Sequence, residues 1–552
     1  MNSKSQLRRS LGVLAAVVGG FGLIGAQLIR LGLQARPEVR TAIAEPIGRS
    51  FSRPDIVDRN GRLLATDIEA HSLYADPALI QDADEAAEKL AELFPDLDAI
   101  ELRRQLSDAA RRFVWIKRGL SPGRARLVHE LGLPGIGFRK ELRRVYPLGR
   151  LAGHMIGSVN VDNKGLSGLE RAIDDAGDVE AVSGPGRSAK PAWQASIDTG
   201  VQHAVEDELA AAITRYGASA AAGIVMDATT GEIVASASLP GVDPGRAAEA
   251  SDPARLDRIQ GGSYELGSIF KALTIAQSLD SGLATIDTAF DVREPLRAGP
   301  FTIKDLHPQG RPLTVREIFL HSSNVGAGMI ALGAGAERQK DFLAKLGLTQ
   351  PLRLETGPVA QPQIPQRWDR TEAITISYGH GLAVAPVQFA AAMATLVNGG
   401  TKVTPSFRAQ IGGRRNGEML QLLSPTTSAR MRELMRLNVT HTSGTGRRAD
   451  VDGYRVGGKT GTAEMPGAGG YQKKAVIASF AAAFPMDAPR YVVLVMLFQP
   501  QGQDETRGQI TAGLNAAPVT GRIVERVAPV VGVLPRRIGE PRTVFDATGN
   551  AQ

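Results

Sequence analysis

An apolar stretch with cationic residues on both sides stands near the start of the chain. Residues Leu11 to Ile29 (LGVLAAVVGGFGLIGAQLI) contain no charged side chain and a single amide. As a helix these 19 residues would be about 28 Å long, close to the roughly 30 Å apolar thickness of a bilayer. A cleaved signal peptide has a shorter apolar region that ends in a small-x-small site, which Ile24-Gly25-Ala26 matches poorly. The pattern predicts a transmembrane signal anchor over 11–29, after a cytoplasmic tail over 1–10.

The region after the anchor mixes strand and helix patterns. Ile56 to Ile68 (IVDRNGRLLATDI) places Asn60-Gly61 between two alternating apolar runs, which predicts a β-hairpin. From Asp82 to Ala110, Ala, Leu and Glu recur at helical spacing, which predicts one or two amphipathic helices. We interpret residues 30–176 as an α+β pedestal domain.

A second unit begins after a segment rich in Gly, Ser and Pro. Gly177 to Ala195 has no apolar period, and we interpret residues 177–195 as a linker. Ala221 to Ser238 holds two β-rich runs around Thr230-Gly231, which predicts another hairpin. Between these segments, apolar residues recur every four positions as on one face of a helix: Val201, Val205, Leu209 and Ile213.

Two apolar runs near the end complete the pattern of the second unit. Val476 to Phe484 and Tyr491 to Phe498 are almost continuously apolar, which predicts strands buried on both faces. A helix is predicted over Ala516 to Val527. Strands at both ends with mainly helical sequence between them favour one antiparallel sheet covered by helices, an α+β domain over 196–535. A polar tail follows over 536–552.

Length and cysteine content limit the number of folded units and the kinds of catalytic or metal site that the chain can form. The 552 residues, 43% of them hydrophobic, exceed the roughly 50–250 residues of one ordinary domain, so two or three folded units are expected. Cysteine is absent from the sequence. This absence excludes disulfides, thiolate metal sites and a cysteine nucleophile.

The excess positive charge lies around the apolar segment. The first 40 residues hold six Lys or Arg and one Glu, six minus one or +5, of the total net charge of +7. No basic face is left for nucleic acid, so a nucleic-acid partner is not expected. Three cations precede the anchor and three follow it, so the charge bias alone does not orient the segment. The short basic tail before the apolar segment favours export of the rest of the chain.

The first candidate catalytic pair is Ser268 and Lys271. The sequence YELGSIFK leads directly into the apolar helical run ALTIAQSL. Gly267 allows a tight entry, and Lys271 at i+3 falls on the same helix face as Ser268. Serine is a poor nucleophile without an adjacent base, and a desolvated lysine near another cation can become that base. The alternative is that Ser268 merely caps the helix and Lys271 is solvated, and this motif alone does not decide between the two.

The second candidate segment is a polar cluster between two apolar helix-like runs. In His321-Ser322-Ser323-Asn324, the Ser322 hydroxyl can pass a proton and the Asn324 amide can hold both a lysine and a substrate carbonyl. Taken alone, the segment is better explained as another helix cap.

The third candidate segment is rich in glycine and has a strand-like pattern. In VGGKTGTA, small residues permit close approach of a substrate backbone, while Lys459, Thr460 and Thr462 can fix a carboxylate beside Gly461. Residues 453–460 (GYRVGGKT) also satisfy the spacing of a phosphate-binding loop. Such a loop follows a buried strand and opens a helix, whereas here ADVD precedes the segment and a Gly/Pro-rich loop follows, so nucleotide binding is disfavoured.

In order and spacing, the three segments resemble the motifs of penicillin-recognising serine transferases. The matching residues are Ser268-x-x-Lys271, Ser322-x-Asn324 and Lys459-Thr460-Gly461. The resemblance extends over nearly the whole chain. Further matching segments are Arg53 to Ala65, Arg144 to Gly149, Gly168 to Glu170, Ile376 to Gly381 and Pro386 to Gln388.

Within this group the chain resembles class B penicillin-binding proteins, especially the septal cell-division (FtsI) type. The resemblance implies a penicillin-binding/serine β-lactamase-like transpeptidase domain on a pedestal of the dimerisation type. No separate glycosyltransferase domain fits in the remaining length. The implied location is the bacterial cytoplasmic (inner) membrane, with a single pass and the catalytic domain on the periplasmic side.

The resemblance also implies a peptidoglycan D,D-transpeptidase that works through a serine acyl-enzyme, with D,D-carboxypeptidase activity as a side reaction. The donor would be a D-Ala-D-Ala stem peptide, and a stem-peptide amine would be the acceptor. The implied roles are Ser268 as nucleophile, Lys271 as base, Ser322 as proton relay, Asn324 as orienting amide, Lys459 with Thr460, Gly461 and Thr462 at the substrate carboxylate, and the N–H groups of Ser268 and Thr462 as oxyanion hole.

β-Lactams are implied as acylating inhibitors, and a SEDS-type glycosyltransferase and other division proteins as partners. The scheme needs no metal or organic cofactor. The eight histidines lack metal-ligand spacing, and we interpret His380 as a loop or packing residue. The alternatives are an elongation-type transpeptidase, a β-lactamase, a β-lactam sensor and a division scaffold with an inactive site. No deacylating base is visible for a β-lactamase, and a sensor would need more than ten residues before the anchor.

Overall fold

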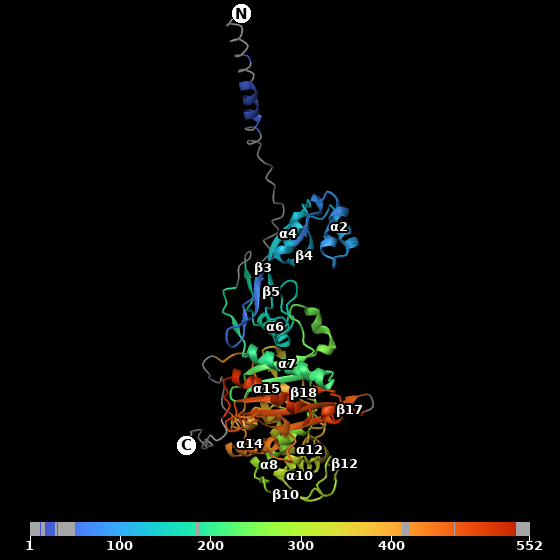
Figure 1. Cartoon of the computed structure of the whole chain (residues 1–552), viewed down its shortest axis with the longest axis vertical. Helices are drawn as coiled ribbons and strands as arrows, with labels where there is room; N and C mark the ends of the chain where they lie inside the picture. The colour runs from blue at the N-terminus through green and yellow to red at the C-terminus, as the bar shows by residue number, and fades with distance from the viewer. Residues whose placement is uncertain are drawn as a thin grey trace, which may run out of the picture.

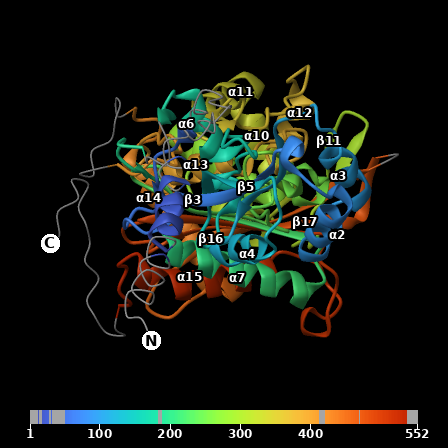
Figure 2. The same ribbon diagram turned by 90° about the horizontal axis from the view of Figure 1, so that it is seen from above.

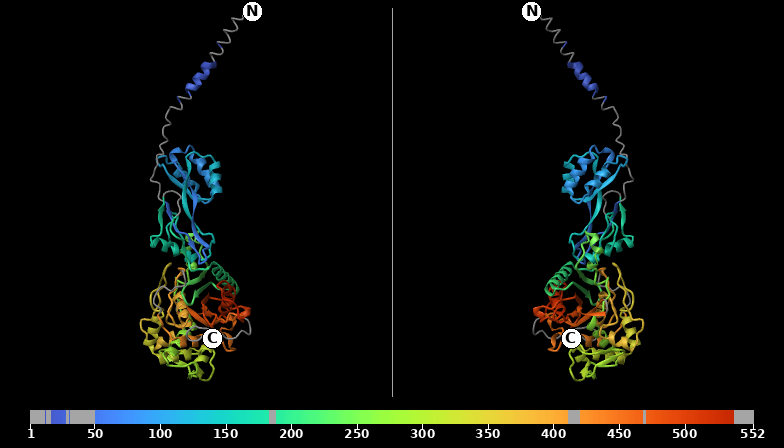
Figure 3. Two further views of the ribbon diagram at one scale, coloured as in Figure 1. Left: turned by 90° about the vertical axis from the view of Figure 1, so that its left-hand side faces the viewer. Right: turned by 90° about the vertical axis from the view of Figure 1, so that its right-hand side faces the viewer.

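The computed structural model describes residues 12, 17–27, 30, 50–182, 188–410, 420–467 and 470–536. Figures 1 and 3 show an elongated molecule, with a pedestal at the N-terminal side of a larger domain that contains the long sheet. Residues 17–27 are helical, but no helix in the described ranges has both the length and the apolar character needed to cross a membrane. The predicted tail over 1–10, all but the first residue of the predicted tail over 536–552, and parts of the predicted anchor over 11–29 lie outside the described residues.

The pedestal is built on a β-sheet around one long strand. Strand β3 (Leu63–Ala75) pairs antiparallel with β2 (Ile56–Val57), β4 (Val114–Leu120) and β5 (Ile136–Val145). The predicted hairpin at Asn60-Gly61 is confirmed, and Gly61 takes the positive φ of 81° that its turn requires.

Three helices cover the outer part of this sheet. They are α2 (Ala83–Leu93), α3 (Ala99–Leu106) and α4 (Pro122–Glu130). The prediction of one or two helices between Asp82 and Ala110 is confirmed, with two present. Asp82 and Asp98 accept hydrogen bonds from the first N–H groups of α2 and α3, which explains where these helices begin. The buried contacts include Leu73, Leu90, Phe94 and Leu102.

A buried ionic network holds the base of the pedestal together. Arg53 and Arg144 donate to opposite oxygens of the Glu170 carboxylate, both at 2.7 Å, and all three side chains are fully buried. Arg144 also pairs with Asp67 of β3 at 3.4 Å. Glu170 belongs to α6 (Gly168–Asp175), so the network joins β3, β5, α6 and the segment before β2. Buried charges are tolerated when each one has partners, and here each one has.

The tip of the first hairpin fastens the pedestal to the larger domain. Thr199, the first residue of α7 (Thr199–Tyr216), donates its hydroxyl to buried Asp58 at 2.9 Å. Asn60 donates its side-chain amide to Asp198, the N-cap of α7, at 2.7 Å. The turn of the pedestal hairpin is therefore fixed to the start of a helix that packs on the central sheet.

The larger domain contains one five-stranded antiparallel sheet in the order β16-β17-β18-β8-β9. Its strands are β8 (Ala220–Asp227), β9 (Ile233–Leu239), β16 (Gly457–Gly467), β17 (Gly470–Phe484) and β18 (Tyr491–Phe498). The centre of the sheet thus combines strands from the beginning and from the end of this domain, as the predicted α+β arrangement requires. The hairpin around Thr230-Gly231 and the two apolar C-terminal strands are confirmed.

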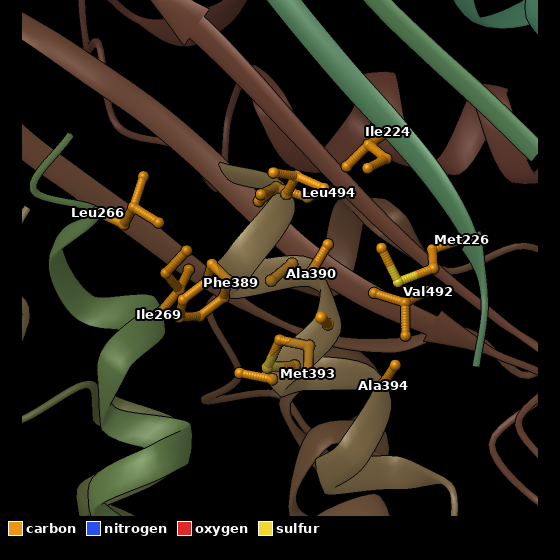
Figure 4. Close-up of a cluster of buried hydrophobic side chains, with 14 of the residues drawn as sticks. Ile224, Met226, Leu266, Ile269, Phe389, Ala390, Met393, Ala394, Val492 and Leu494 are labelled. Carbon is orange, nitrogen blue, oxygen red and sulfur yellow. The ribbon is translucent and has the colours of Figure 1, made fainter. Parts of the chain in front are cut away.

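Helices cover both faces of this sheet, as the view from above shows (Figure 2). On one face lie α7 and α15 (Ala516–Val530), which confirms the two predicted helices. On the other face lies α13 (Pro386–Val397), every residue of which is buried. Figure 4 shows Phe389 and Met393 of α13 against Val492 and Leu494 of β18. The intervening residues of β18 face the α7 and α15 side, which is why the whole strand is apolar.

Candidate active site

The predicted nucleophile lies on a short helical turn anchored in the core. Ser268 belongs to the 3₁₀ turn η4 (Gly267–Phe270), and Lys271 is the first residue of α8 (Lys271–Asp280). Ile269 packs into the core beside α13 (Figure 4), while Ser268 stays partly exposed. Lys271 Nζ lies 3.0 Å from Ser268 Oγ. The i+3 spacing therefore brings the amine to the hydroxyl, as predicted.

Glycines allow neighbouring segments to approach this turn closely. Gly267 has φ of 60°, and a Cβ placed on Gly379 would lie 2.1 Å from the Gly267 carbonyl oxygen. On the other side, a Cβ on Gly461 would lie 2.5 Å from the Leu266 carbonyl oxygen. Side chains at Gly379 or Gly461 would push the nucleophile segment out of place.

The second predicted segment closes around the same lysine. Helix α9 (Val315–His321) ends with Ser322 in a left-handed conformation, φ 56°, and Ser323 then caps α10 (Asn324–Ala334). This sharp reversal turns Ser322 and Asn324 toward Lys271. Lys271 Nζ lies 2.5 Å from the Ser322 carbonyl oxygen, 3.1 Å from Ser322 Oγ and 2.7 Å from Asn324 Oδ1.

The third predicted segment lies in β16, the edge strand of the sheet. Lys459 Nζ lies 3.0 Å from Ser322 Oγ, so the Ser322 hydroxyl stands between the two lysines. Thr460 Oγ1 lies 2.7 Å from the hydroxyl of Thr445. Because Lys459 and Thr460 are inside a strand and no helix begins there, the segment does not have the architecture of a phosphate-binding loop.

The open edge of β16 presents backbone groups to the nucleophile turn. Gly458 directs its carbonyl oxygen away from β17, to the amide of Asn438 at 2.8 Å. Thr462 is four residues further along the strand, and its carbonyl oxygen lies 3.0 Å from a Cβ placed on Gly267. In an antiparallel strand the N–H and C=O of one residue point to the same side, so the N–H of Thr462 faces this turn. The Ser268 N–H is near the helix start and lacks an intrahelical acceptor.

Burial sets the charge state of the two lysines. Lys271 and Lys459 are both 0% exposed. Burial, reinforced by the nearby Lys459 ammonium, holds the pKa of Lys271 well below its usual range, while the Asp305 carboxylate acts in the opposite direction. Burial lowers the pKa of Lys459 to about 7. A neutral Lys271 beside a Lys459 that still carries a proton is therefore accessible near neutral pH.

The hydrogen-bond partners of Lys271 suit a neutral amine that acts as a base. The Ser322 carbonyl and Asn324 Oδ1 can only accept hydrogen bonds. A neutral amine has two N–H groups, which these two oxygens can take, and one lone pair. Ser268 Oγ, at 3.0 Å, is then placed to donate its proton to that lone pair.

Several neighbours of the site carry no sequence signal that predicts them. Asp305 accepts from Ser323 and from the start of α10, 18 residues away in sequence. Asn438 accepts from Thr445, which in turn contacts Thr460. A lone Asp, Asn or Thr is common in any sequence, so only the fold shows that these residues adjoin the predicted motifs.

His380 lies in the loop after α12 (Arg370–Ile376). Its Nδ1 lies 3.1 Å from Glu265 Oε2, and its ring meets that of Tyr378 edge to face. Among the described residues, no group of three or more His, Asp or Glu side chains is arranged to hold a metal ion.

Comparison with known families places both domains. Residues 221–525 match the penicillin-binding protein transpeptidase domain, and residues 50–177 match the penicillin-binding protein dimerisation domain. The chain belongs to the class B penicillin-binding proteins. The predicted family and enzyme class, a serine-type peptidoglycan D,D-transpeptidase of the FtsI type, are thereby confirmed.

Two curated relatives illustrate this membership. The "Probable peptidoglycan D,D-transpeptidase FtsI" of Caulobacter vibrioides is 41% identical over 518 residues, 91% of this chain and 85% of the relative. The peptidoglycan D,D-transpeptidase FtsI of Escherichia coli is 30% identical over 520 residues, 88% of this chain and 85% of the relative. Both alignments include the pedestal as well as the transpeptidase domain.

Solved structures share the fold of this penicillin-binding protein. Penicillin-binding protein 3 of Mycobacterium tuberculosis, in complex with aztreonam, has a TM-score of 0.67 and 25% identity, and covers 89% of this chain and 98% of its own. A peptidoglycan synthetase of Bifidobacterium adolescentis has a TM-score of 0.66 and 27% identity, covering 91% and 99% respectively.

The penicillin-binding protein thus gathers the predicted site residues from three distant segments. Six of them form one hydrogen-bonded cluster: Ser268, Lys271, Ser322, Asn324, Lys459 and Thr460. Gly461 and Thr462 continue the same strand along the nucleophile turn, and Thr462 accepts at its hydroxyl from the Ala512 N–H at 3.1 Å.

Proposed function

We propose that this penicillin-binding protein cross-links stem peptides at the division septum through an acyl-enzyme on Ser268. The observation that carries the proposal is the position of the Ser268 hydroxyl, 3.0 Å from a buried lysine whose other partners are two carbonyl oxygens and the Ser322 hydroxyl. Such an arrangement makes an otherwise weak nucleophile reactive, because the base is neutral and oriented before the substrate arrives.

In the acylation step, Ser268 Oγ attacks the carbonyl between the two terminal D-alanines, and its proton passes to Lys271. The N–H groups of Ser268 and Thr462 stabilise the oxyanion, where one donor is typically worth about 3–4 kcal/mol. The C–N bond then breaks, and the leaving D-alanine amine takes a proton from Lys271 through the Ser322 hydroxyl. The contacts of Ser322 Oγ with both lysines support this relay.

In the second step, a stem-peptide amine attacks the Ser268 ester, and the hydroxyl regains its proton as the new amide forms. Attack by water instead would give D,D-carboxypeptidase activity. Asn324 orients Lys271 and the substrate amide relative to each other. The scheme moves protons and one acyl group only, so it requires no metal or organic cofactor.

The donor carboxylate is placed by β16. Lys459, Thr460 and Thr462 offer a cation and two hydroxyls along the edge of the strand, and Gly461 between them leaves room for the peptide backbone. β-Lactams present a similar carboxylate and carbonyl, so they acylate Ser268 in place of the donor. The mycobacterial relative is solved in complex with the β-lactam aztreonam, which supports β-lactam binding by this chain.

The cellular context extends the same proposal. The apolar segment over 11–29 would anchor the protein in the cytoplasmic membrane by a single pass, with the pedestal and the transpeptidase domain on the periplasmic side. A SEDS-type glycosyltransferase and other division proteins would be its partners. The names of the Caulobacter and Escherichia relatives support the division role over an elongation role.

Labelling with a fluorescent penicillin tests the proposed function. The purified full-length protein in detergent is expected to form a covalent adduct that survives denaturation, and peptide mapping is expected to place the label on Ser268. A label that persists for hours is expected of a transpeptidase. Rapid release of the label would instead indicate a β-lactamase, and a label on another residue would refute the proposal.

Replacement of Lys459 by alanine is expected to slow acylation by a carboxylate-bearing donor about 100-fold, because a charge-assisted contact is lost. It also removes the cation that, in addition to burial, lowers the pKa of Lys271. Since acylation needs neutral Lys271, the acid limb of the rate profile is expected to move to higher pH. In the wild type, loss of the Lys459 proton at a pKa of about 7 is expected to give an alkaline limb, which the variant lacks.

Acylation rates measured across pH check this expectation, with Lys340→Ala on the exposed face of α11 (Ala336–Lys345) as the matched control. An unchanged acid limb in Lys459→Ala would show that the Lys459 charge does not influence the pKa of the base, Lys271.

A further inference from the structure

Asp305 lies beside the second motif, in the loop after β12 (Phe301–Ile303). One carboxylate oxygen accepts the Asn324 N–H at 2.6 Å and the Val325 N–H at 3.0 Å. The other oxygen accepts the Ser323 hydroxyl at 2.6 Å. Asp305 therefore makes three hydrogen bonds to one end of a helix from a segment remote in sequence.

These contacts complete the N-terminus of α10. Asn324, Val325 and Gly326 are the first three residues of this helix, and their N–H groups lack intrahelical acceptors. Asp305 takes the first two, and the Ser323 hydroxyl takes the Gly326 N–H at 2.9 Å. A negative charge at this end of the helix is also favoured by the helix dipole.

The side chain of Asn324 depends on this backbone. Its Oδ1 lies 2.7 Å from Lys271 Nζ, and Ser322, two residues earlier, holds a strained left-handed conformation. Without Asp305, the start of α10 and the preceding turn would lose the acceptor that fixes them against the neighbouring loop. The hydrogen bonds that orient Lys271 would then loosen.

We infer that Asp305 is a positioning residue for the acylation reaction, which holds Ser322 and Asn324 against Lys271 and supplies a negative charge near that lysine. The inference rests on the proposed function of Ser268 and Lys271. It assigns a role to a residue that lies outside the three motifs.

The charge of Asp305 distinguishes this role from a purely structural one. The charged groups that act on Lys271 are Lys459 from β16 and Asp305 from the loop after β12. Lys459 disfavours the protonated amine, whereas Asp305 favours it. Removal of the Asp305 charge therefore lowers the pKa of Lys271 further, and neutral Lys271 persists to lower pH.

Two variants distinguish the hydrogen bonds that Asp305 accepts from the effect of its negative charge. Asp305→Asn keeps one oxygen for the Asn324 and Val325 N–H groups but removes the charge, whereas Asp305→Ala removes both. The second-order rate of acylation by a fluorescent penicillin is measured across pH for both variants, for the wild type and for Asp341→Asn, a change of an exposed residue on α11. Thermal unfolding of each protein reports whether it is folded.

Asp305→Ala is expected to lower the plateau rate about tenfold or more, as for loss of hydrogen bonds to a charged group. Asp305→Asn is expected to keep most of the plateau and to move the acid limb to lower pH, while Asp341→Asn matches the wild type. A wild-type acid limb in Asp305→Asn overturns the inference, as does a wild-type plateau in folded Asp305→Ala. If Asp305→Ala does not fold, the acid limb of Asp305→Asn decides alone. Failure of the wild type to label at Ser268 would refute the proposed function instead.

Discussion

Replacement of Ser268 by alanine is expected to abolish covalent labelling by β-lactams and to reduce transpeptidation by at least about four orders of magnitude. The hydroxyl is the only proposed acceptor of the acyl group, and alanine offers no substitute. Ser268 is partly exposed at the start of a helical turn, whereas its neighbour Ile269 is fully buried. Loss of one hydroxyl here is therefore expected to leave the fold intact.

Denaturing gels after incubation with a fluorescent penicillin measure this loss, and thermal unfolding confirms that the variant is folded. Ser251→Ala, which changes an exposed serine in η2 (Ala247–Ser251), is the matched control and is expected to label normally. Persistent label in folded Ser268→Ala would mean that another residue carries the acyl group, and the mechanism proposed here would be wrong.

Local patterns in the sequence predict much of the fold. The hairpins at Asn60-Gly61 and Thr230-Gly231, the helices after Asp82 and Asp198, and the two apolar strands near the end follow from turn chemistry, capping and periodicity over a few residues. The short strands are less visible. For example, β7 (Trp193–Gln194) pairs in parallel with β2 only because tertiary contacts bring the two together.

The predicted site likewise combines contacts that follow from local sequence with contacts that depend on the tertiary fold. Ser268 and Lys271 come together through helical spacing, which the sequence contains. Lys271 contacts Asn324, which lies 53 positions further along the chain, and Lys459, 188 positions further along than Lys271, joins the cluster through the Ser322 hydroxyl. Resemblance to a family, rather than spacing, predicted that these residues come together. No sequence motif indicated Asp305 as part of the site.

The shifted pKa values of the two lysines could not be predicted from the sequence, because they depend on burial. Nothing in the residues around Lys271 or Lys459 shows that both side chains are fully buried. Burial and the nearby Lys459 ammonium lower the pKa of Lys271, which suits it to the proposed role of base, while the Asp305 carboxylate acts in the opposite direction. The proposed reactivity of Ser268 thus depends on three titratable groups on three separate segments.

Replacement of Lys271 by alanine is expected to slow acylation by about three to four orders of magnitude, the upper range for loss of a positioned general base. The partly buried Ser322 carbonyl and Asn324 Oδ1 also lose their donor. The residual rate is expected to rise continuously with pH, because hydroxide must then remove the Ser268 proton. The wild type is expected to reach a plateau between the pKa of Lys271, which lies well below the usual lysine value, and the alkaline limb set by loss of the Lys459 proton.

Rapid-mixing measurements of acylation across pH test this expectation, with Lys345→Ala at the exposed end of α11 as the matched control. Lys271→Arg adds a second comparison, because a guanidinium can donate to the same carbonyls but stays protonated and cannot act as the base. Both Lys271 variants are expected to be slow, provided that thermal unfolding shows them to be folded. A pH plateau within tenfold of the wild-type rate in either folded variant would show that some other group takes the proton from Ser268.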